Sequence, residues 1–87
     1  MNLGEIKAIS FSGHMHGATC LDSNHQVIRP CILWNDTRSH QECEEIMKDT
    51  SVMDIAGNIA MPGFTAPKVL WLKHNETKNF QSIDKVL

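Results

Sequence analysis

Two histidines, His14 and His16, are separated by a single residue in a segment that the sequence predicts to be extended. Side chains two residues apart on an extended chain point to the same side, so these two imidazoles could bind a transition metal together. The remaining ligands would have to come from scattered side chains, namely Cys20, His25, Cys31, Asp36, His40 and Cys43. None of these has the spacing of a known metal site. A pocket for a polar ligand is therefore the better interpretation.

A second polar block runs from Trp34 to Arg38 and includes Asp36, which could form a local ion pair with Arg38 at the start of a helix. A thiol nucleophile also needs a nearby base, and for Cys20 this base could be His16 or His25. Cysteines between apolar neighbours usually serve packing, however. The glycines stand singly, so no phosphate-binding loop can be written. Both polar blocks follow predicted strands, where folds commonly hold polar side chains in a cleft.

The elements that would position these blocks begin with short strands. Alternating or continuous apolar residues predict four of them, at 6–12, 17–21, 27–30 and 31–34. The polar residues 22–26 predict a turn that makes a hairpin of the second and third strands. Pro30 cannot donate a hydrogen bond to a neighbouring strand, so the return arm should lie at an edge or end there.

Helical patterns follow the strands. Thr37 is expected to cap a helix over 38–49 that lies at the surface, because its apolar stripe is thin. Three further helices are predicted, at 51–56 before Gly57, at 65–75 with Pro67 in the first turn, and at 77–83. Residues 58–64 should form a loop, and 84–87 should begin a strand. The fold class is thus α/β. The strands are too few for a complete sheet, so we expect a segment of a larger domain; the alternative is a small complete α+β domain.

The composition of the chain argues against several classes of function. The chain has 87 residues, 41% of them hydrophobic and 21% charged, with a net charge of −2. No basic cluster predicts binding to nucleic acid or to an anionic membrane, and no apolar stretch is long enough to span one. Three cysteines are an odd number with no metal-site spacing, which favours free thiols in a reducing cytoplasm.

A family resemblance covers the chain from Ile6 onward. It is carried by Ser-Gly-His-Met-His-Gly-Ala-Thr at 12–19, Val-Ile-Arg-Pro at 27–30, Ile-Leu-Trp-Asn-Asp-Thr-Arg at 32–38 and Met-Pro-Gly-Phe-Thr-Ala-Pro-Lys-Val-Leu-Trp at 61–71. In order and spacing these motifs resemble an internal stretch of the amino-terminal domain of bacterial xylulokinases, within the FGGY family of carbohydrate kinases. The resemblance implies a ribonuclease H-like fold, as in actin-like ATPases, and ATP-dependent phosphorylation of D-xylulose with magnesium.

The resemblance also implies which residues bind the sugar. Met15 and His16 would contact it, and the next layer, lining or bracing the pocket, would be Trp34, Asn35, Asp36 and Arg38. A neutral imidazole both donates and accepts hydrogen bonds, as sugar hydroxyls do, and a methionine offers an adaptable apolar wall. Glutamine is usual in the family where His14 stands here, so the resemblance assigns no role to His14.

Several family features are not found among these residues. They are the Asp-Leu-Gly-Thr phosphate-binding strand, the aspartate that serves as general base and the adenine-binding second domain. We therefore expect residues 1–87 to be a partial amino-terminal kinase domain that carries part of the ketose site. It should contain no catalytic residue, bind neither ATP nor metal alone, and pair with the rest of the kinase or with itself. The alternative is a stand-alone domain of the same ancestry that binds a small ligand or a partner.

Overall fold

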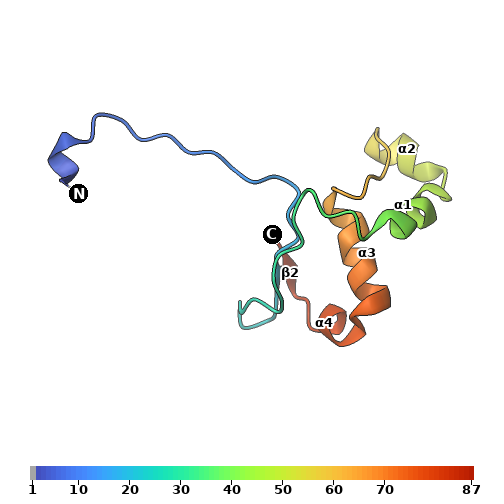
Figure 1. Cartoon of the computed structure of the whole chain (residues 1–87). Helices are drawn as coiled ribbons and strands as arrows, with labels where there is room; N and C mark the ends of the chain where they lie inside the picture. Colours follow the sequence, from blue (N-terminus) through green and yellow to red (C-terminus); the bar gives the residue numbers. More distant parts are fainter. Residues whose placement is uncertain (1) are drawn as a thin grey trace.

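Near the amino-terminal end of the chain an extended segment projects from the rest of the molecule (Figure 1). The computed structural model describes residues 2–87. A short 3-10 turn, η1 (Leu3–Glu5), precedes the segment. The predicted strand at 6–12 is wrong: within the described chain no backbone hydrogen bond joins residues 7–12 to another segment, and Phe11 is 92% exposed. A strand exists only when a neighbour satisfies its N–H and C=O groups, and the described residues offer none here.

The predicted hairpin is confirmed, although its strands are very short. β1 (Cys20–Leu21) and the residues just before it pair on one side with residues 27–32 through single bridges, Ala18 with Ile32 and Leu21 with Val27. The Asp22 carboxylate closes the turn by accepting two backbone N–H groups at 2.9 Å. On its other side β1 pairs antiparallel with β2 (Lys85–Val86), so the strand predicted at the end of the chain is also present.

The four predicted helices are confirmed: the second and third have the predicted bounds, and the first and fourth are shorter than predicted. They are α1 (His40–Met47), α2 (Ser51–Ala56), α3 (Thr65–Asn75) and α4 (Thr77–Gln81). Gly57 ends α2 in the left-handed conformation, at φ 69°, which glycine adopts without strain. The expected cap at Thr37 is wrong, because α1 starts only after Ser39. The Asp36 carboxylate instead accepts the backbone N–H of Arg38 and forms a separate turn before the helix.

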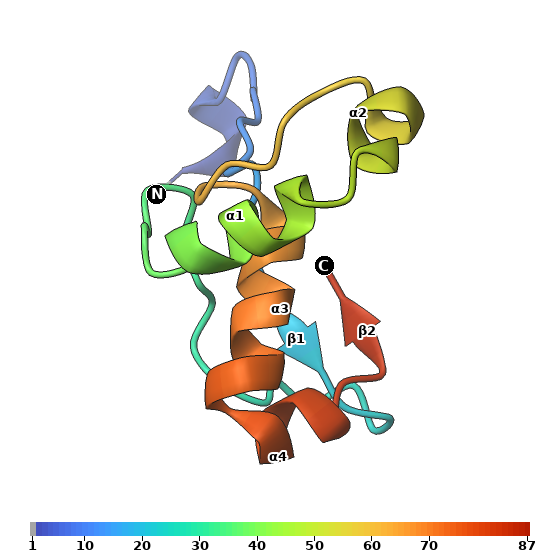
Figure 2. The ribbon, with the colours of Figure 1, turned by 90° about the vertical axis from the view of Figure 1, so that its right-hand side faces the viewer.

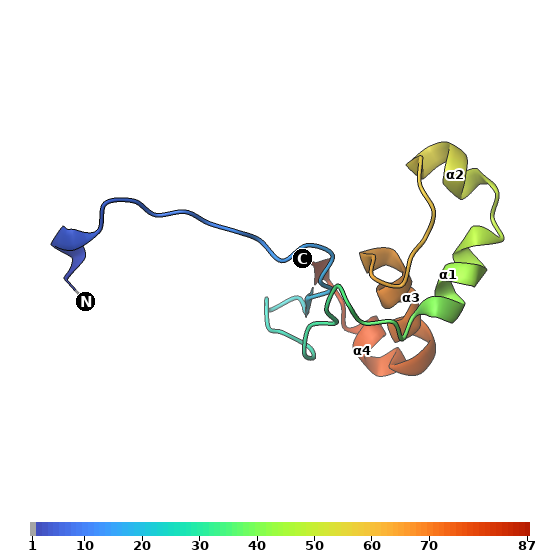
Figure 3. The same ribbon diagram turned by 45° about the horizontal axis from the view of Figure 1, so that its top comes forward.

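Helix α3 lies between α1 and the strands and supplies the centre of a small core (Figure 2). Its Leu72 is fully buried against Ala18, Cys20 and Ile32. Val69, Leu70 and Trp71 are only half-buried, so of the four apolar positions expected to be buried in this helix only Leu72 is fully so. Figure 3 shows α2 standing away from α3, with the 57–64 loop returning the chain to the start of α3. None of the helices described is long and apolar enough to cross a membrane.

Candidate functional site

Two adjoining hollows lie where the projecting segment meets the folded part of the chain. The larger is a cleft of about 360 Å³ lined by Met15, His16, Trp34, Thr37 and residues 61–64. The second, of about 270 Å³, is lined by Gly13, His14, Met15 and Trp34. Met15 and Trp34 belong to both hollows. The structure thus brings together three of the six residues proposed to bind sugar, because Trp34 lies beside the adjacent residues Met15 and His16.

His16 sits in a turn and not on an extended strand. Its backbone has φ 61°, a left-handed conformation that is uncommon for a residue with a Cβ atom. Its ring packs against Phe64 with centroids 4.8 Å apart, whereas the His14 ring lies 6.4 Å from that of Trp34. The expectation that alternation places both imidazoles on one side therefore does not apply. Across residues 2–87 no three side chains of His, Cys, Asp or Glu are grouped to hold a metal ion.

The loop of residues 61–64 forms one wall of the cleft and is held closely in place. A Cβ atom on Gly63 would lie 2.6 Å from the carbonyl oxygen of Trp34, so only glycine fits there without a backbone shift. The fully buried Ser39 donates its hydroxyl to the carbonyl of Pro62 at 3.2 Å. These two contacts fix the loop against Trp34 and against the start of α1.

Lys68 joins the two sides of the cleft from beneath. This lysine of α3 is fully buried, and its Nζ donates to the carbonyl of His16 and, at 2.8 Å, to that of Gly63. Burial lowers the pKa of the Lys68 ammonium, while Cys31 and Asp36 act in the opposite direction. Sequence reasoning missed this residue. A single charge between Pro67 and the apolar run of α3 was the signal that could have drawn attention to it.

Asp36 and Arg38 form an ion pair and line neither hollow. Both oxygens of Asp36 accept from the Arg38 guanidinium, at 2.9 and 2.7 Å, and this pairing lowers the pKa of the carboxyl to about 2. Such a carboxylate is a very weak base at neutral pH, so it is a poor general base. The guanidinium in turn lies 4.8 Å from the ring centre of Trp71. Asn35 is exposed and lines neither hollow.

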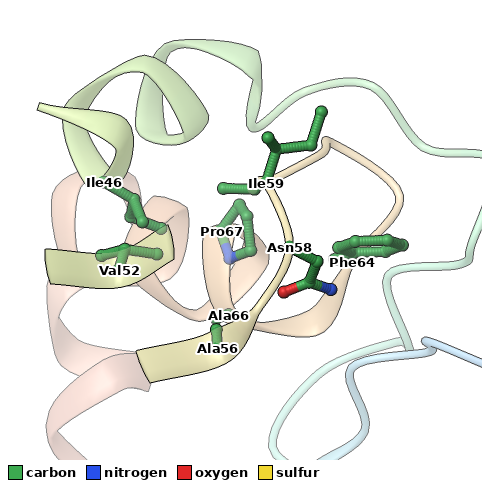
Figure 4. A pocket seen from close by; sticks show the side chains of 9 residues that line it. Ile46, Val52, Ala56, Asn58, Ile59, Phe64, Ala66 and Pro67 are labelled. Atoms are coloured by element: carbon green, nitrogen blue, oxygen red, sulfur yellow. The ribbon is translucent and has the colours of Figure 1, made fainter. Parts of the chain in front are cut away.

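A further pocket of about 130 Å³ lies behind the cleft, between α1, α2 and the start of α3 (Figure 4). Its walls are mostly apolar: Ile46 and Val52 lie on one side of Pro67, and the Phe64 ring lies on the other. Asn58 is the polar side chain among its lining residues, and none of them is ionisable. This pocket offers packing surface and no acid–base chemistry.

The model of the FGGY family of carbohydrate kinases, N-terminal domain, matches residues 1–87. The chain belongs to this family. It is 51% identical to a xylulose kinase of Escherichia coli (strain K12) and 48% identical to one of Klebsiella pneumoniae, in each case over 99% of this chain and 18% of the relative. The solved structure of a xyloylose kinase from Brucella ovis matches with a TM-score of 0.83 at 56% identity, over 86% of this chain and 16% of that one.

The comparison confirms the family resemblance and the α/β class of this FGGY member. It also sets the scale, because the chain spans less than a fifth of the length of these relatives. The roles of Met15, His16, Trp34, Asn35, Asp36 and Arg38 toward a sugar stay a prediction.

Proposed function

We propose that this chain is the ketose-binding part of a xylulokinase that phosphorylates D-xylulose with ATP. The observation that supports this most is the cleft itself. Met15 and His16, which the family resemblance assigns to the sugar, line it together with Trp34. Nearly the whole of this chain aligns with xylulose kinases, which favours a pentulose over other ligands.

The side chains of the cleft suit a small sugar. The His16 imidazole can donate to one hydroxyl and accept from another, while Met15 and Trp34 offer apolar surface to the carbon chain. Their role would be to orient the terminal hydroxyl, and phosphoryl transfer depends largely on such positioning. In this proposal Asp36 and Arg38 act indirectly, by holding the 34–38 turn in place.

The described residues do not fit ATP or magnesium. They contain no glycine-rich phosphate loop and no cluster of carboxylates, and both oxygens of Asp36 are already engaged by Arg38. We therefore assign ATP and Mg²⁺ to the rest of the kinase. Residues 1–87 would then be a partial amino-terminal domain of ribonuclease H-like fold, acting in the cytoplasm, where ATP and reduced thiols are both present.

Phosphoryl transfer should require more than these 87 residues. Incubated with ATP, Mg²⁺ and D-xylulose, the chain alone should release no ADP above a blank without protein, because we assign the general base and the phosphate-binding groups to the rest of the kinase. The complete gene product, by which we mean the whole kinase that contains these 87 residues, should release ADP with D-xylulose in a coupled assay. If the chain alone released ADP and His16→Ala abolished this activity, the proposal that catalysis requires the rest of the kinase would be wrong. A complete product that phosphorylates only unrelated alcohols such as glycerol would overturn the proposed substrate.

We further propose that the isolated chain associates with itself, and that in the kinase the same surface pairs with the rest of the protein. Ile9 and Phe11 are 71% and 92% exposed on a segment whose backbone has no partner strand in the described chain. The radius of gyration, 16.8 Å, exceeds the roughly 12 Å of a compact chain of this length. Exposed apolar side chains on an open strand favour pairing with another chain. Sedimentation equilibrium at micromolar concentration should give a mass above that of one chain; a clean monomer would refute the proposal.

A further inference from the structure

We propose that Lys68 is a positioning residue that fixes the distance between the His16 turn and the 61–64 loop, and that it thereby sets the affinity for the ketose. This inference rests on the proposed function. Lys68 does not line either hollow, so its effect on the sugar must pass through the backbone groups that it holds.

The first support is the burial of Lys68 together with the position of its partners. Its side chain is fully buried, next to the equally buried Pro67 and one turn from Leu72. An ammonium in such a place is costly unless it is hydrogen-bonded. Its two acceptors are carbonyls of His16 and Gly63, 52 and 5 residues away in sequence, and both residues line the cleft. A group that only filled space in the core would not need this charge.

The second support is the backbone at His16, which a comparison with His25 makes clear. Both histidines have φ 61°, a conformation that costs energy when a Cβ atom is present. The turn at His25 is held locally, because the backbone and side chain of Asp22 accept N–H groups from residues 24–26. Among the described residues no backbone bond closes the turn at His16. In the described part of the chain, the bond from Lys68 to the His16 carbonyl is the hydrogen bond that holds residues 13–17, and the next backbone bonds begin at Ala18.

The third support is that the opposite wall cannot move to compensate. Gly63 lies so close to the Trp34 carbonyl that even a Cβ atom has no room, and the carbonyl of Pro62 is held by Ser39. If the Lys68 ammonium is removed, the freedom gained should therefore appear on the His16 side. Loss of the lysine should widen the cleft and displace the imidazole from its position against Phe64.

The test uses the complete gene product with Lys68→Met, which keeps the length of the stem and removes the ammonium. We expect the KM for D-xylulose to rise at least tenfold while the KM for ATP stays within twofold of the wild type. Lys73→Met, on an exposed lysine of the same helix, should leave both values unchanged. Lys68→Gln, which keeps N–H donors without the charge, should give a smaller rise than methionine.

An unchanged KM for the ketose in folded Lys68→Met would overturn the inference. If the methionine variant does not fold, Lys68→Gln decides in the same way. The proposed function is tested separately, by measuring the rate of the wild type with a panel of ketoses. The KM of Lys68→Met is then compared with that of the wild type on a ketose that the wild type phosphorylates. Hydrogen exchange measured by mass spectrometry gives a readout that needs no activity. Peptides covering residues 13–17 should exchange faster in Lys68→Met than in Lys73→Met, and equal exchange would show that Lys68 does not hold the turn.

Discussion

Replacing Leu72 by alanine should destabilise the chain by about 2–5 kcal/mol, the usual effect of removing a fully buried leucine side chain. Leu72 is 0% exposed and lies in a small core whose other buried members are Ala18, Cys20 and Ile32. A chain of this length has only about 4–13 kcal/mol of total stability. Urea titration followed by circular dichroism should therefore show a large loss, extending to unfolding without denaturant.

Leu3→Ala is the matched control, because it removes the same atoms from a residue that is 75% exposed on η1. It should change the free energy of unfolding by less than about 0.5 kcal/mol, as is usual for surface substitutions. Similar midpoints for Leu72→Ala and Leu3→Ala would mean that α3 does not pack on β1 in solution. The arrangement that places Lys68 beneath the cleft would then also be wrong.

In the complete gene product, His16→Ala should lower kcat/KM for D-xylulose by about 5- to 150-fold. This corresponds to about 1–3 kcal/mol, the usual cost of losing a hydrogen-bonding partner of a buried polar group. His16 lines the cleft, and its ring is held by Phe64 at a centroid distance of 4.8 Å. The KM for ATP should remain close to the wild-type value, since the proposal places ATP elsewhere in the kinase.

His25→Ala controls for the backbone as well as for the change of residue. His25 has the same φ of 61°, but it lies exposed in the hairpin turn and lines none of the pockets described above. Any effect that comes only from placing alanine in the left-handed conformation should therefore appear in both variants. Equal losses of kcat/KM would remove the reason for placing the sugar at His16.

The elements that the sequence predicted correctly are those whose signals are local. Gly57 ends α2 because glycine alone adopts its backbone conformation without strain, and Pro67 lies in the first turn of α3 where its missing N–H does no harm. The hairpin turn was predictable because the Asp22 side chain bonds to N–H groups only two and four residues ahead. In each case the interacting groups lie within one turn of chain.

The failures concern features that depend on distant parts of the chain. Residues 6–12 have a strand-like pattern, but a strand forms only against a neighbour. The carbonyl of His16, in its left-handed turn, accepts a hydrogen bond from Lys68, which lies 52 residues away, and nothing in the sequence near His16 indicates this partner. The role of Gly63 likewise comes from the approach of the Trp34 backbone. The proposed sugar-binding residues could be named from family resemblance, whereas the hydrogen bonds of Lys68 to the carbonyls of His16 and Gly63 could not be predicted.

The central claim is that a ketose binds in the cleft between the His16 turn and the 61–64 loop. The most direct measurement is a crystal structure of the complete gene product with D-xylulose bound. We expect sugar hydroxyls within hydrogen-bonding distance of the His16 imidazole, the carbon chain against Met15, and Lys68 bonded to the carbonyls of His16 and Gly63. A well-ordered sugar bound elsewhere, with this cleft empty, would contradict it.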